Sequence, residues 1–384
     1  MARPNLLSLF DDFARFRKDI AVIHLRGYRR ESLNYAKLSG NAISCSLELR
    51  QRGVRTNDRV LLWGPNSPEW VTAFWACLLR GAVVVPLDDS STIDFASRVA
   101  ADAGVQFAIV SRSKPPLAPA VPTLFLEDFP DILKGPRGFW TSRPGNEPAK
   151  ALCQSLADEA ITRDHVAQIL FTSGTTSEPR GVVLSHGNFL ANLEPLEQGI
   201  EPYRKYERWF HPLRFVSVVP LSHVFGQFMA LFVPPLLGAT VVFENSALPT
   251  EILRTIKRER ATALIVVPRM LDALRNTLLS DYSQPPRSIR FELDYRSAAV
   301  QPFLQRAWMF RSIHRRLGWK FWAFISGGAA LSSETEEFFK RIGYAVVQGY
   351  GMTETASLIS LNHPFRAAEG SVGKVLPGRE FRLA

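Results

Sequence analysis

The chain has 384 residues, of which 46% are hydrophobic, so it can fill the cores of two or three domains of about 150 residues each. With 21% charged and 11% aromatic residues, and with 24 Gly and 26 Pro spread along the chain, the composition excludes overall disorder, collagen and coiled coil. The net charge of +10 favours anionic partners, namely nucleotides, coenzyme A phosphates, carboxylates, nucleic acid or acidic membrane surfaces, without choosing among them.

The cysteines and the apolar stretches give no sign of a disulfide framework or a membrane span. Cys45, Cys77 and Cys153 lie far apart without metal-ligand spacing, so a reducing cytosol fits the chain. The first 19 residues predict an amphipathic helix and lack the pattern of a targeting signal. Residues 215–243 contain no charged residue, but their prolines and glycines predict strand, loop, helix and strand.

Strands and helices alternate along the chain. RVLLW from Arg59 predicts a strand, Ser67 caps a helix that ends at Gly81, and a β-branched run follows. The pattern continues with a helix over 91–103 and a strand at QFAIVS. Residues 114–148 are rich in Pro and Gly and predict a meandering connection. Repeated βα units predict a largely parallel sheet covered on both faces.

The alternation resumes at Ala167 and runs to Tyr350. Strands are predicted at AQILF, VVLSH, FVSVVP, ATVVF, TALIVVP, KFWAFIS and AVVQGY, with helices over 250–260 and 270–279. The basic, aromatic segment 287–319 has a mostly helical pattern and is expected to form part of the outer layer of the core.

The first polar turn is FTSGTTSEPRG, in which a strand runs into the small or hydroxyl residues Thr172 to Ser177. Backbone N–H and hydroxyl groups of such residues converge on phosphate oxygens, and Arg180 adds a permanent cation. The spacing is not that of a Walker A loop. A hydrophilic turn between two strands explains the same composition.

The second turn is QGYGMTET, in which Tyr350 stands between two glycines. Its ring can stack on a purine, while Thr353 and Glu354 can meet a phosphate and its magnesium. The alternative is a turn with a core tyrosine. The third and fourth turns are SGGAALSS, where a capped helix explains most of the pattern, and PLSH, where a lone His223 is usually structural. Because all four turns follow predicted strands, they favour one nucleotide site.

Five motifs in this order resemble the successive core motifs of the adenylate-forming superfamily of acyl-CoA synthetases, luciferases and peptide-synthetase adenylation domains. They are FTSGTTSEPRGVVLSH, PLSHVFG, SGGAALS, QGYGMTET and GSVGKVLPGREFRL. The likeness runs from about Leu33 to the last residue, and PLSHVFG with LNHPF is most similar to the long-chain fatty-acid CoA ligase branch. The resemblance implies an α/β fold of two αβ-layered subdomains with largely parallel sheets. The expected divisions are 1–55 with 205–365, then 56–204, and 366–384 as the start of a β-barrel subdomain.

The resemblance implies a ligase that activates a carboxylate with ATP and Mg²⁺, giving an acyl-adenylate and pyrophosphate, and then transfers the acyl group to a thiol. The substrate is expected to be a fatty acid, and the thiol that of CoA or a carrier protein. A cytoplasmic location that allows peripheral membrane contact is expected, and no nucleic-acid partner. The alternatives are an aryl or amino-acid adenylating domain, or a fragment that binds nucleotide or acyl chain without turnover.

Carried over by motif, the phosphates would be held by Thr172, Ser173, Gly174, Thr175, Thr176 and Arg180. Thr172 and Glu354 would ligate magnesium, and Thr353 would contact the α-phosphate. The base and ribose side would be formed by Gly328, Ala329, Gly349, Tyr350, Gly351 and Met352, with Tyr350 stacked on the adenine. His223 would lie between the acyl tunnel and the reacting carboxylate.

Three departures from the family pattern affect this assignment. Ser177 stands where the family has glycine, so the loop carries one additional side chain. Arg180 stands where the family has lysine, so a forked guanidinium replaces a compact ammonium group. The family's ribose-binding Asp, its hinge residue and its catalytic Lys belong beyond residue 384. The chain is therefore expected to be a truncated large domain.

Overall fold

The computed structural model describes residues 2–27, 29–132, 156–172, 180–203, 211–364, 368, 370–380 and 382. The chain forms two compact units. Unit 1 comprises Met1–Pro212, Pro220–Thr240 and Thr353–Ser357, and unit 2 comprises Leu213–Val219, Val241–Met352 and Leu358–Ala384. These units divide the chain differently from the expected subdomains 1–55 with 205–365, 56–204 and 366–384, whose boundaries stay a prediction.

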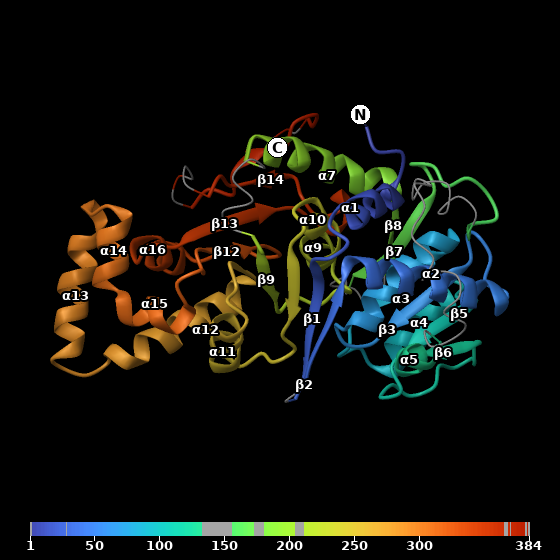
Figure 1. Ribbon diagram of the computed structural model, residues 1–384, viewed down its shortest axis with the longest axis horizontal. Helices are drawn as coiled ribbons and strands as arrows, with labels where there is room; N and C mark the ends of the chain where they lie inside the picture. Colours follow the sequence, from blue (N-terminus) through green and yellow to red (C-terminus); the bar gives the residue numbers. More distant parts are fainter. Residues whose placement is uncertain are drawn as a thin grey trace. The chain divides into compact units, whose positions relative to one another are not determined.

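Unit 1 contains a sheet with the strand order β6-β5-β3-β4-β7-β8 (Figure 1). All neighbouring pairs are parallel except β7 and β8, which form an antiparallel pair at one edge. The strands are β3 (Arg59–Trp63), β4 (Val83–Leu87), β5 (Phe107–Val110), β6 (Thr123–Phe125), β7 (Val166–Thr172) and β8 (Arg180–Ser185). The largely parallel sheet predicted from the βα alternation is confirmed.

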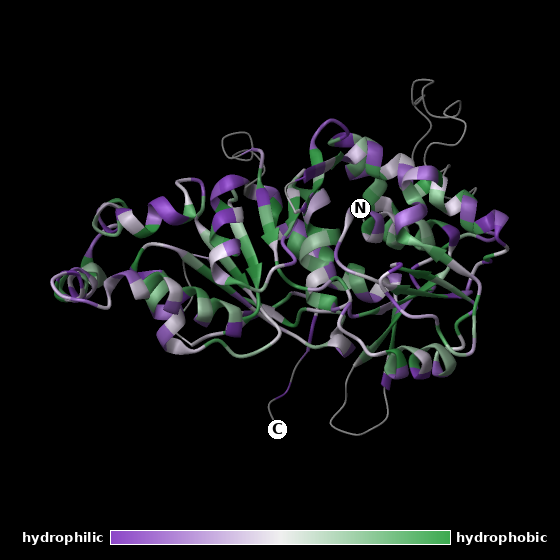
Figure 2. Cartoon of the chain, turned by 90° about the horizontal axis from the view of Figure 1, so that it is seen from below, coloured by the Kyte–Doolittle hydropathy of each residue, from purple (hydrophilic) through white to green (hydrophobic). Residues whose placement is uncertain are grey.

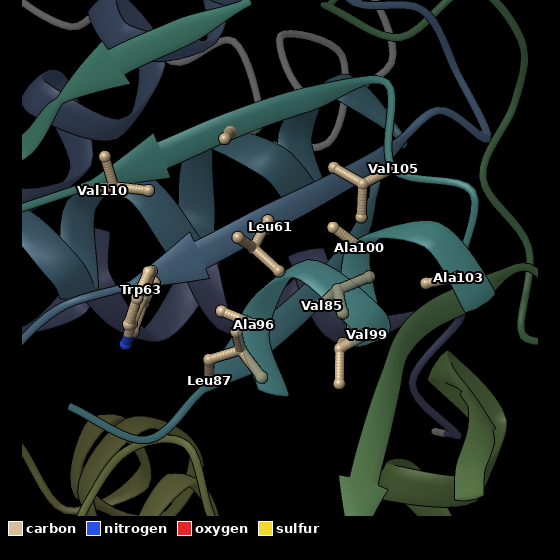
Figure 3. Packing of buried hydrophobic residues seen from close by; sticks show 11 residues of the cluster. Leu61, Trp63, Val85, Leu87, Ala96, Val99, Ala100, Ala103, Val105 and Val110 are labelled. Carbon is tan, nitrogen blue, oxygen red and sulfur yellow. The ribbon is translucent and has the colours of Figure 1, made fainter. Parts of the chain in front are cut away.

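The helix after β3 forms as its caps predict, and the helix expected near 91–103 follows β4. The Ser67 side chain accepts a hydrogen bond from Trp70 N at the start of α3 (Pro68–Arg80), and Gly81 ends this helix at φ +72°. Thr92 caps α4 (Ile93–Asp102) in the same way. The side chains that α4 buries pack on alternate residues of three strands, among them Leu61, Val85 and Val110 (Figure 3). This alternation is what a period of two residues along each strand requires.

The amino-terminal segment of unit 1 contains the predicted helix, a hairpin and a long helix. They are η1 (Leu6–Ser8), α1 (Leu9–Arg15), the antiparallel pair β1 (Ile20–Arg26) and β2 (Arg29–Asn34), and α2 (Tyr35–Gln51). The Tyr35 hydroxyl donates to the Ala239 carbonyl oxygen at 2.6 Å, which fixes α2 to a segment about two hundred residues away in sequence. The short elements η2 (Leu126–Asp128) and α5 (Phe129–Ile132) follow β6.

Residues 220–240 of unit 1 form short helices rather than a membrane span. They are α9 (Val224–Gln227), the π-helix η5 (Phe228–Phe232) and α10 (Val233–Leu236). The Phe232 ring lies 5.9 Å from the rings of Phe74 and Trp75 and 5.1 Å from that of Phe189, so this segment closes an aromatic core. Across the part of the chain that the structure describes, no helix is both long and apolar enough to cross a bilayer.

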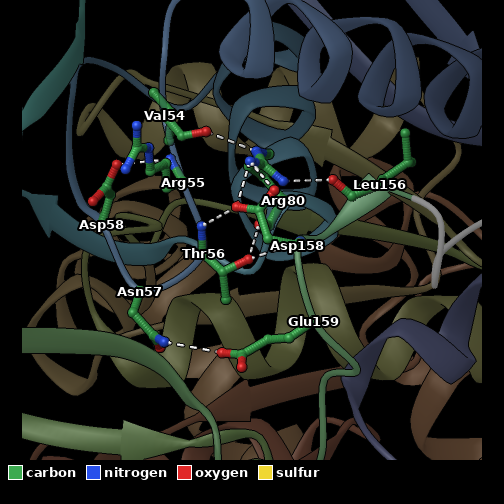
Figure 4. Close-up of polar contacts among 9 residues, drawn as sticks. All are labelled: Val54, Arg55, Thr56, Asn57, Asp58, Arg80, Leu156, Asp158 and Glu159. Carbon is green, nitrogen blue, oxygen red and sulfur yellow. Dashed lines mark hydrogen bonds and ion pairs between the residues drawn. The ribbon is translucent and has the colours of Figure 1, made fainter.

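Arg80, at the end of α3, fixes the segment 156–159 to this helix and to Val54 (Figure 4). Its buried guanidinium donates to the Val54 and Leu156 carbonyl oxygens at 2.7 and 2.8 Å, and to both Asp158 oxygens at 2.7 and 2.6 Å. Thr56 exchanges two hydrogen bonds with Asp158. The hydrogen bonds from Arg80 hold the pKa of Asp158 below its usual value.

Unit 2 contains strands in the order β15-β14-β13-β12-β11-β9-β10. Their bounds are β9 (Arg214–Ser217), β10 (Thr240–Phe243), β11 (Ala263–Val266), β12 (Ala323–Ser326), β13 (Ala345–Tyr350), β14 (Ser360–Leu361) and β15 (Lys374–Val375). The pairs β9–β11, β11–β12 and β12–β13 are parallel, while β14 and β15 are added antiparallel. Hydrophobic residues concentrate in the strands, whereas the helices carry both hydrophilic and hydrophobic residues (Figure 2).

The helices of unit 2 are α11 (Pro249–Arg258), α12 (Pro268–Leu279), α13 (Arg287–Ser297), α14 (Phe303–Met309), α15 (Arg311–Leu317) and α16 (Ser333–Arg341), with η6 (Ser280–Tyr282) and η7 (Ala298–Val300). Residues 287–319, which were predicted to form part of the outer layer of the core, pack against it only in part. Ala298, Phe310, Ile313 and Leu317 are buried, but most of the segment's other large apolar side chains are exposed.

Candidate functional site

The β7–β8 hairpin brings the two ends of the first predicted motif together. Thr172 is the direct partner of Arg180 in the antiparallel register. Arg180 is exposed, and no carboxylate of the described chain pairs with it. The residues between them that were predicted to bind phosphate, Ser173, Gly174, Thr175 and Thr176, lie outside the described residues, as does Ser177. Within the described part of the hairpin, the Arg180 cation therefore lies beside the end of β7 without a carboxylate partner.

The tip of the second motif lies against this hairpin, within unit 1. Residues 353–357 form the turn η8 (Thr353–Thr355), which contacts β8. Ala356 N donates to Thr353 O at 3.0 Å and closes the turn. Asn192, fully buried on α7 (His186–Ile200), donates from Nδ2 to Thr355 O and Ala356 O, each at 2.8 Å. Two backbone carbonyls thus fix the turn that carries Glu354.

Glu354 offers a carboxylate that suits a hard cation. It is exposed, and among the described side chains none forms an ion pair or hydrogen bond with it. The described residues contain no group of three or more His, Cys, Asp or Glu able to enclose a metal. Magnesium commonly uses only one or two carboxylates together with substrate phosphates. The residues present therefore fit magnesium delivered with a nucleotide, but not a metal site built from protein ligands alone.

The base-side residues collect in unit 2, at the carboxyl ends of two parallel strands. Ser326 of β12 pairs with Gln348 of β13, so Gly328 and Ala329 follow one strand close to the end of the next. Gly328 has φ +86°, which a residue with a Cβ adopts only with strain. Tyr350 is half exposed, as its proposed stacking role requires, and Met352 is also exposed. The alternative interpretation of Tyr350, a turn with a core tyrosine, is therefore wrong.

Gly349 allows the Leu358 side chain to approach the backbone of β13 closely. A Cβ at this position would lie 2.8 Å from Leu358 Cδ2, and Ile359 N donates to Tyr350 O at 2.7 Å where the loop returns. Gly351 to Leu358 therefore form a loop that leaves β13 and returns as β14. Gly351 and Met352 of this loop belong to unit 2, whereas Thr353 and Glu354 belong to unit 1.

His223 lies beside Asp88, a residue that the motif analysis did not single out. His223 Nε2 is 3.6 Å from Asp88 Oδ2, and Ser222 Oγ donates to the same oxygen at 3.1 Å. Ser90 donates to the other oxygen from its backbone N at 2.8 Å and from Oγ at 2.6 Å. Burial opposes ionisation, but the hydrogen bonds from Ser90 and the proximity of His223 hold the pKa of Asp88 below its usual value.

One feature of the sequence could have indicated Asp88 as a site residue. It follows directly after the buried strand β4, and parallel strands present polar side chains at their carboxyl ends. Leu221 N donates to Asn66 Oδ1 at 2.8 Å, so the turn after β3 and the turn before α9 meet at the same point. Asp88 and Asn66 therefore join His223 in one polar cluster of unit 1.

The family model described as AMP-binding enzyme matches residues 9–384. A feruloyl-CoA synthase of Amycolatopsis sp is 28% identical over 92% of this chain and 61% of its own length. The long-chain-fatty-acid–CoA ligase heimdall of Drosophila melanogaster is 25% identical over 86% of this chain and 53% of its own. The chain thus spans slightly more than half the length of these relatives.

Solved structures share the fold at lower identity. O-succinylbenzoate coenzyme A synthetase of Bacillus subtilis, in complex with ATP and magnesium ion, has a TM-score of 0.69 at 22% identity, covering 98% of this chain and 66% of its own. The N-terminal domain of FACL13 from Mycobacterium tuberculosis gives 0.70 at 20%, covering 98% and 83%. Because the family model covers almost the whole sequence, the chain belongs to the family of AMP-binding enzymes.

Proposed function

We propose that the protein is an AMP-forming acid–thiol ligase that adenylates a carboxylate with ATP and passes the acyl group to CoA. The observation that carries this proposal is the meeting of η8 with β8. It places the turn bearing the Glu354 carboxylate against the strand that begins with the Arg180 guanidinium, two charges that no described side chain pairs. Opposite charges that have no partner among the described residues, on two contacting elements, suit a ligand that carries both phosphate and a cation.

The side chains have distinct proposed roles. Arg180 binds phosphate oxygens with its forked donors. Glu354 and Thr172 supply oxygen ligands for magnesium. Magnesium, when bound with the nucleotide, neutralises charge on the phosphates. Thr353 orients the α-phosphate for attack by the substrate carboxylate. The reaction needs no protein nucleophile, since positioning and charge stabilisation suffice.

The base side of the nucleotide is assigned to residues of the SGGAALSS and QGYGMTET turns. Tyr350 stacks on the adenine, and Gly328, Ala329, Gly349, Gly351 and Met352 line the approach to it. The backbone of Gly328, in a conformation that glycine adopts without strain, and the exposed ring of Tyr350 support this assignment. Stacking of an aromatic side chain on a base is worth about 1 to 3 kcal/mol.

A fatty acid is the proposed substrate, and an aryl acid is the second candidate. PLSHVFG and LNHPF support the first, while the similarity to a feruloyl-CoA synthase favours the second. Of the apolar run 225–232, Phe228 and Phe232 are fully buried in the aromatic core, whereas Phe225 is half buried. Core packing therefore explains most of this run, and Phe225 remains available to contact an acyl chain.

The test is carboxylate-dependent exchange of pyrophosphate into ATP by the full protein, with long-chain fatty acids and ferulate as parallel substrates. Glu354→Gln should lower exchange by about two or more powers of ten with little change in melting temperature. Asp102→Asn, at the exposed end of α4, is the matched control and should leave exchange unchanged. Near-normal exchange by Glu354→Gln would refute the magnesium assignment, and exchange with ferulate alone would favour the aryl candidate.

A further inference from the structure

The helices α13, α14 and α15 at one end of unit 2 (Figure 1) carry an unusual share of exposed apolar side chains. Of the fifteen large apolar residues exposed in the described chain, eight lie between residues 289 and 322. They are Ile289, Leu293, Val300, Phe303, Leu304, Trp308, Trp319 and Trp322. Exposed apolar side chains that cluster in this way mark a surface that contacts something else.

Other side chains of this segment, which are buried, provide its internal packing. Phe310, Ile313 and Leu317 are buried, and the Phe291 ring packs on the rings of Tyr282 and Phe310 at 4.8 and 5.7 Å. The most exposed of the apolar residues, Val300, Leu304 and Trp319, therefore contribute little to the internal packing. On α14, Phe303, Leu304 and Trp308 share one broad face, since they are one and five positions apart.

The same segment is strongly basic. Residues 287–322 contain eight Arg or Lys and only two acidic residues, Glu292 and Asp294. Both acids are paired within α13, with Arg296 at 2.7 Å and with Arg290 at 4.0 Å. In the described chain, no carboxylate lies within ion-pair distance of Arg287, Arg311, Arg315 or Lys320. These cations are available to an anionic partner.

The cations flank the aromatic rings. The Arg311 guanidinium lies 5.0 Å from the Trp308 ring centre, and Arg260 and Lys320 lie 5.9 and 5.7 Å from that of Trp319. Tryptophan beside arginine or lysine is the combination that occupies the headgroup level of a bilayer, with the ring partly in the acyl region and the cation on phosphate.

We propose that the exposed face of residues 287–322 binds the surface of a membrane rich in anionic lipid, with Leu304 and Trp308 inserted and Arg287 and Arg315 on lipid phosphates. Charge complementarity and the aromatic side chains both fit this occupant. Membrane binding does not depend on the proposed ligase function, although a fatty-acid substrate would reach the enzyme from the same bilayer.

The test is co-sedimentation of the full protein with vesicles of phosphatidylcholine alone, and of phosphatidylcholine mixed with phosphatidylglycerol at about three to one. Binding to the mixed vesicles should exceed binding to the neutral ones and should weaken with salt. Each Lys or Arg near an anionic surface contributes about fivefold in affinity. Arg287→Glu with Arg315→Glu should therefore lower affinity by about twentyfold or more, and Leu304→Ser with Trp308→Ser by about tenfold or more.

The matched controls lie outside this segment. Lys18→Glu with Lys37→Glu reverses two exposed cations of unit 1, and Leu248→Ser removes an exposed leucine of unit 2. Both should bind vesicles as the unchanged protein does. All variants should keep their melting temperature and their pyrophosphate exchange with a short, water-soluble carboxylate.

Three outcomes would overturn the proposal. They are no binding to mixed vesicles, equal loss in the control variants, or a dimer in solution that Leu304→Ser with Trp308→Ser dissociates while vesicle binding is unchanged. The last result would assign the face to a second copy of the chain instead.

Discussion

At the scale of single residues, Asp88 is proposed as a positioning residue for His223. Its carboxylate is itself held by Ser90 and Ser222, so it is a fixed acceptor 3.6 Å from the imidazole Nε2. Asp88→Asn should lower carboxylate-dependent pyrophosphate exchange by about tenfold while the KM for ATP is unchanged, because the imidazole loses its orientation.

A double-mutant cycle checks this prediction. In a His223→Ala background, Asp88→Asn should have little further effect, since the two side chains act as one unit. Independent, multiplicative losses would show that Asp88 supports the site in some other way.

His186 makes stability depend on pH. It is buried at the start of α7 and accepts a hydrogen bond from Leu6 N at Nδ1, at 3.3 Å. Burial, with a smaller effect of His165, lowers its pKa to about 3. Between pH 6.5 and 3 the unfolded chain therefore binds a proton that the folded chain does not. Stability that is fully present above pH 6.5 should decline on acidification, by about 1.4 kcal/mol per pH unit from this group.

Urea titrations at pH 7 and pH 5 measure this loss. His186→Asn keeps an acceptor near the position of Nδ1 but does not titrate, so its stability should fall less over the same interval. Equal pH dependence in both proteins would assign the loss to other groups.

At the scale of elements, Arg80 holds the segment 156–159 to the end of α3 through the contacts of Figure 4. Arg80→Met keeps the apolar stem but leaves two carbonyls without their donor. We expect a loss of about 2 to 4 kcal/mol in the free energy of unfolding, measured in urea. Asp158→Asn should cost less, because Asp158 is nearly half exposed and water replaces the lost charge.

The elements themselves could largely be predicted, because local signals determine them. Ser67 and Gly81 occupy the expected positions at the ends of their helix, and the strands fall on the apolar runs. The strand β6 was missed because it lies in the Pro-rich connection and owes its pairing with β5 to neighbours far away in sequence. The antiparallel register of Thr172 and Arg180 likewise depends on pairing, which composition does not encode.

The candidate site could be predicted where the functional side chains lie within one sequence motif. Glu354 and Tyr350 belong to such a motif, and both present exposed side chains. Asp88 and Asn192 could not be predicted as partners of His223 and of the 353–357 turn. An acid after a strand or an amide inside a helix is common, and only tertiary packing gives it a specific neighbour.

At the scale of the whole molecule, neither unit is one continuous stretch of chain. A fragment of residues 1–212 lacks η5, whose Phe232 ring covers Phe74, Trp75 and Phe189. This fragment should expose those rings, bind a dye that reports apolar surface and be cleaved readily by proteases. A fragment of residues 1–240 restores the aromatic core and should be markedly more resistant. Equal protease resistance of the two would show that η5 is not needed for the core.

The contact between Asn192 and the 353–357 turn also sets an order of events during synthesis. The two carbonyls that accept from Asn192 belong to residues at least 163 positions later in the chain. At about 5 to 20 residues per second, a ribosome needs roughly 8 to 33 s to reach them. During that interval α7 and β8 can form, but the surface that receives η8 stays uncovered. The candidate magnesium ligand Glu354 thus reaches its place last, when nearly all of the surrounding unit has already been made.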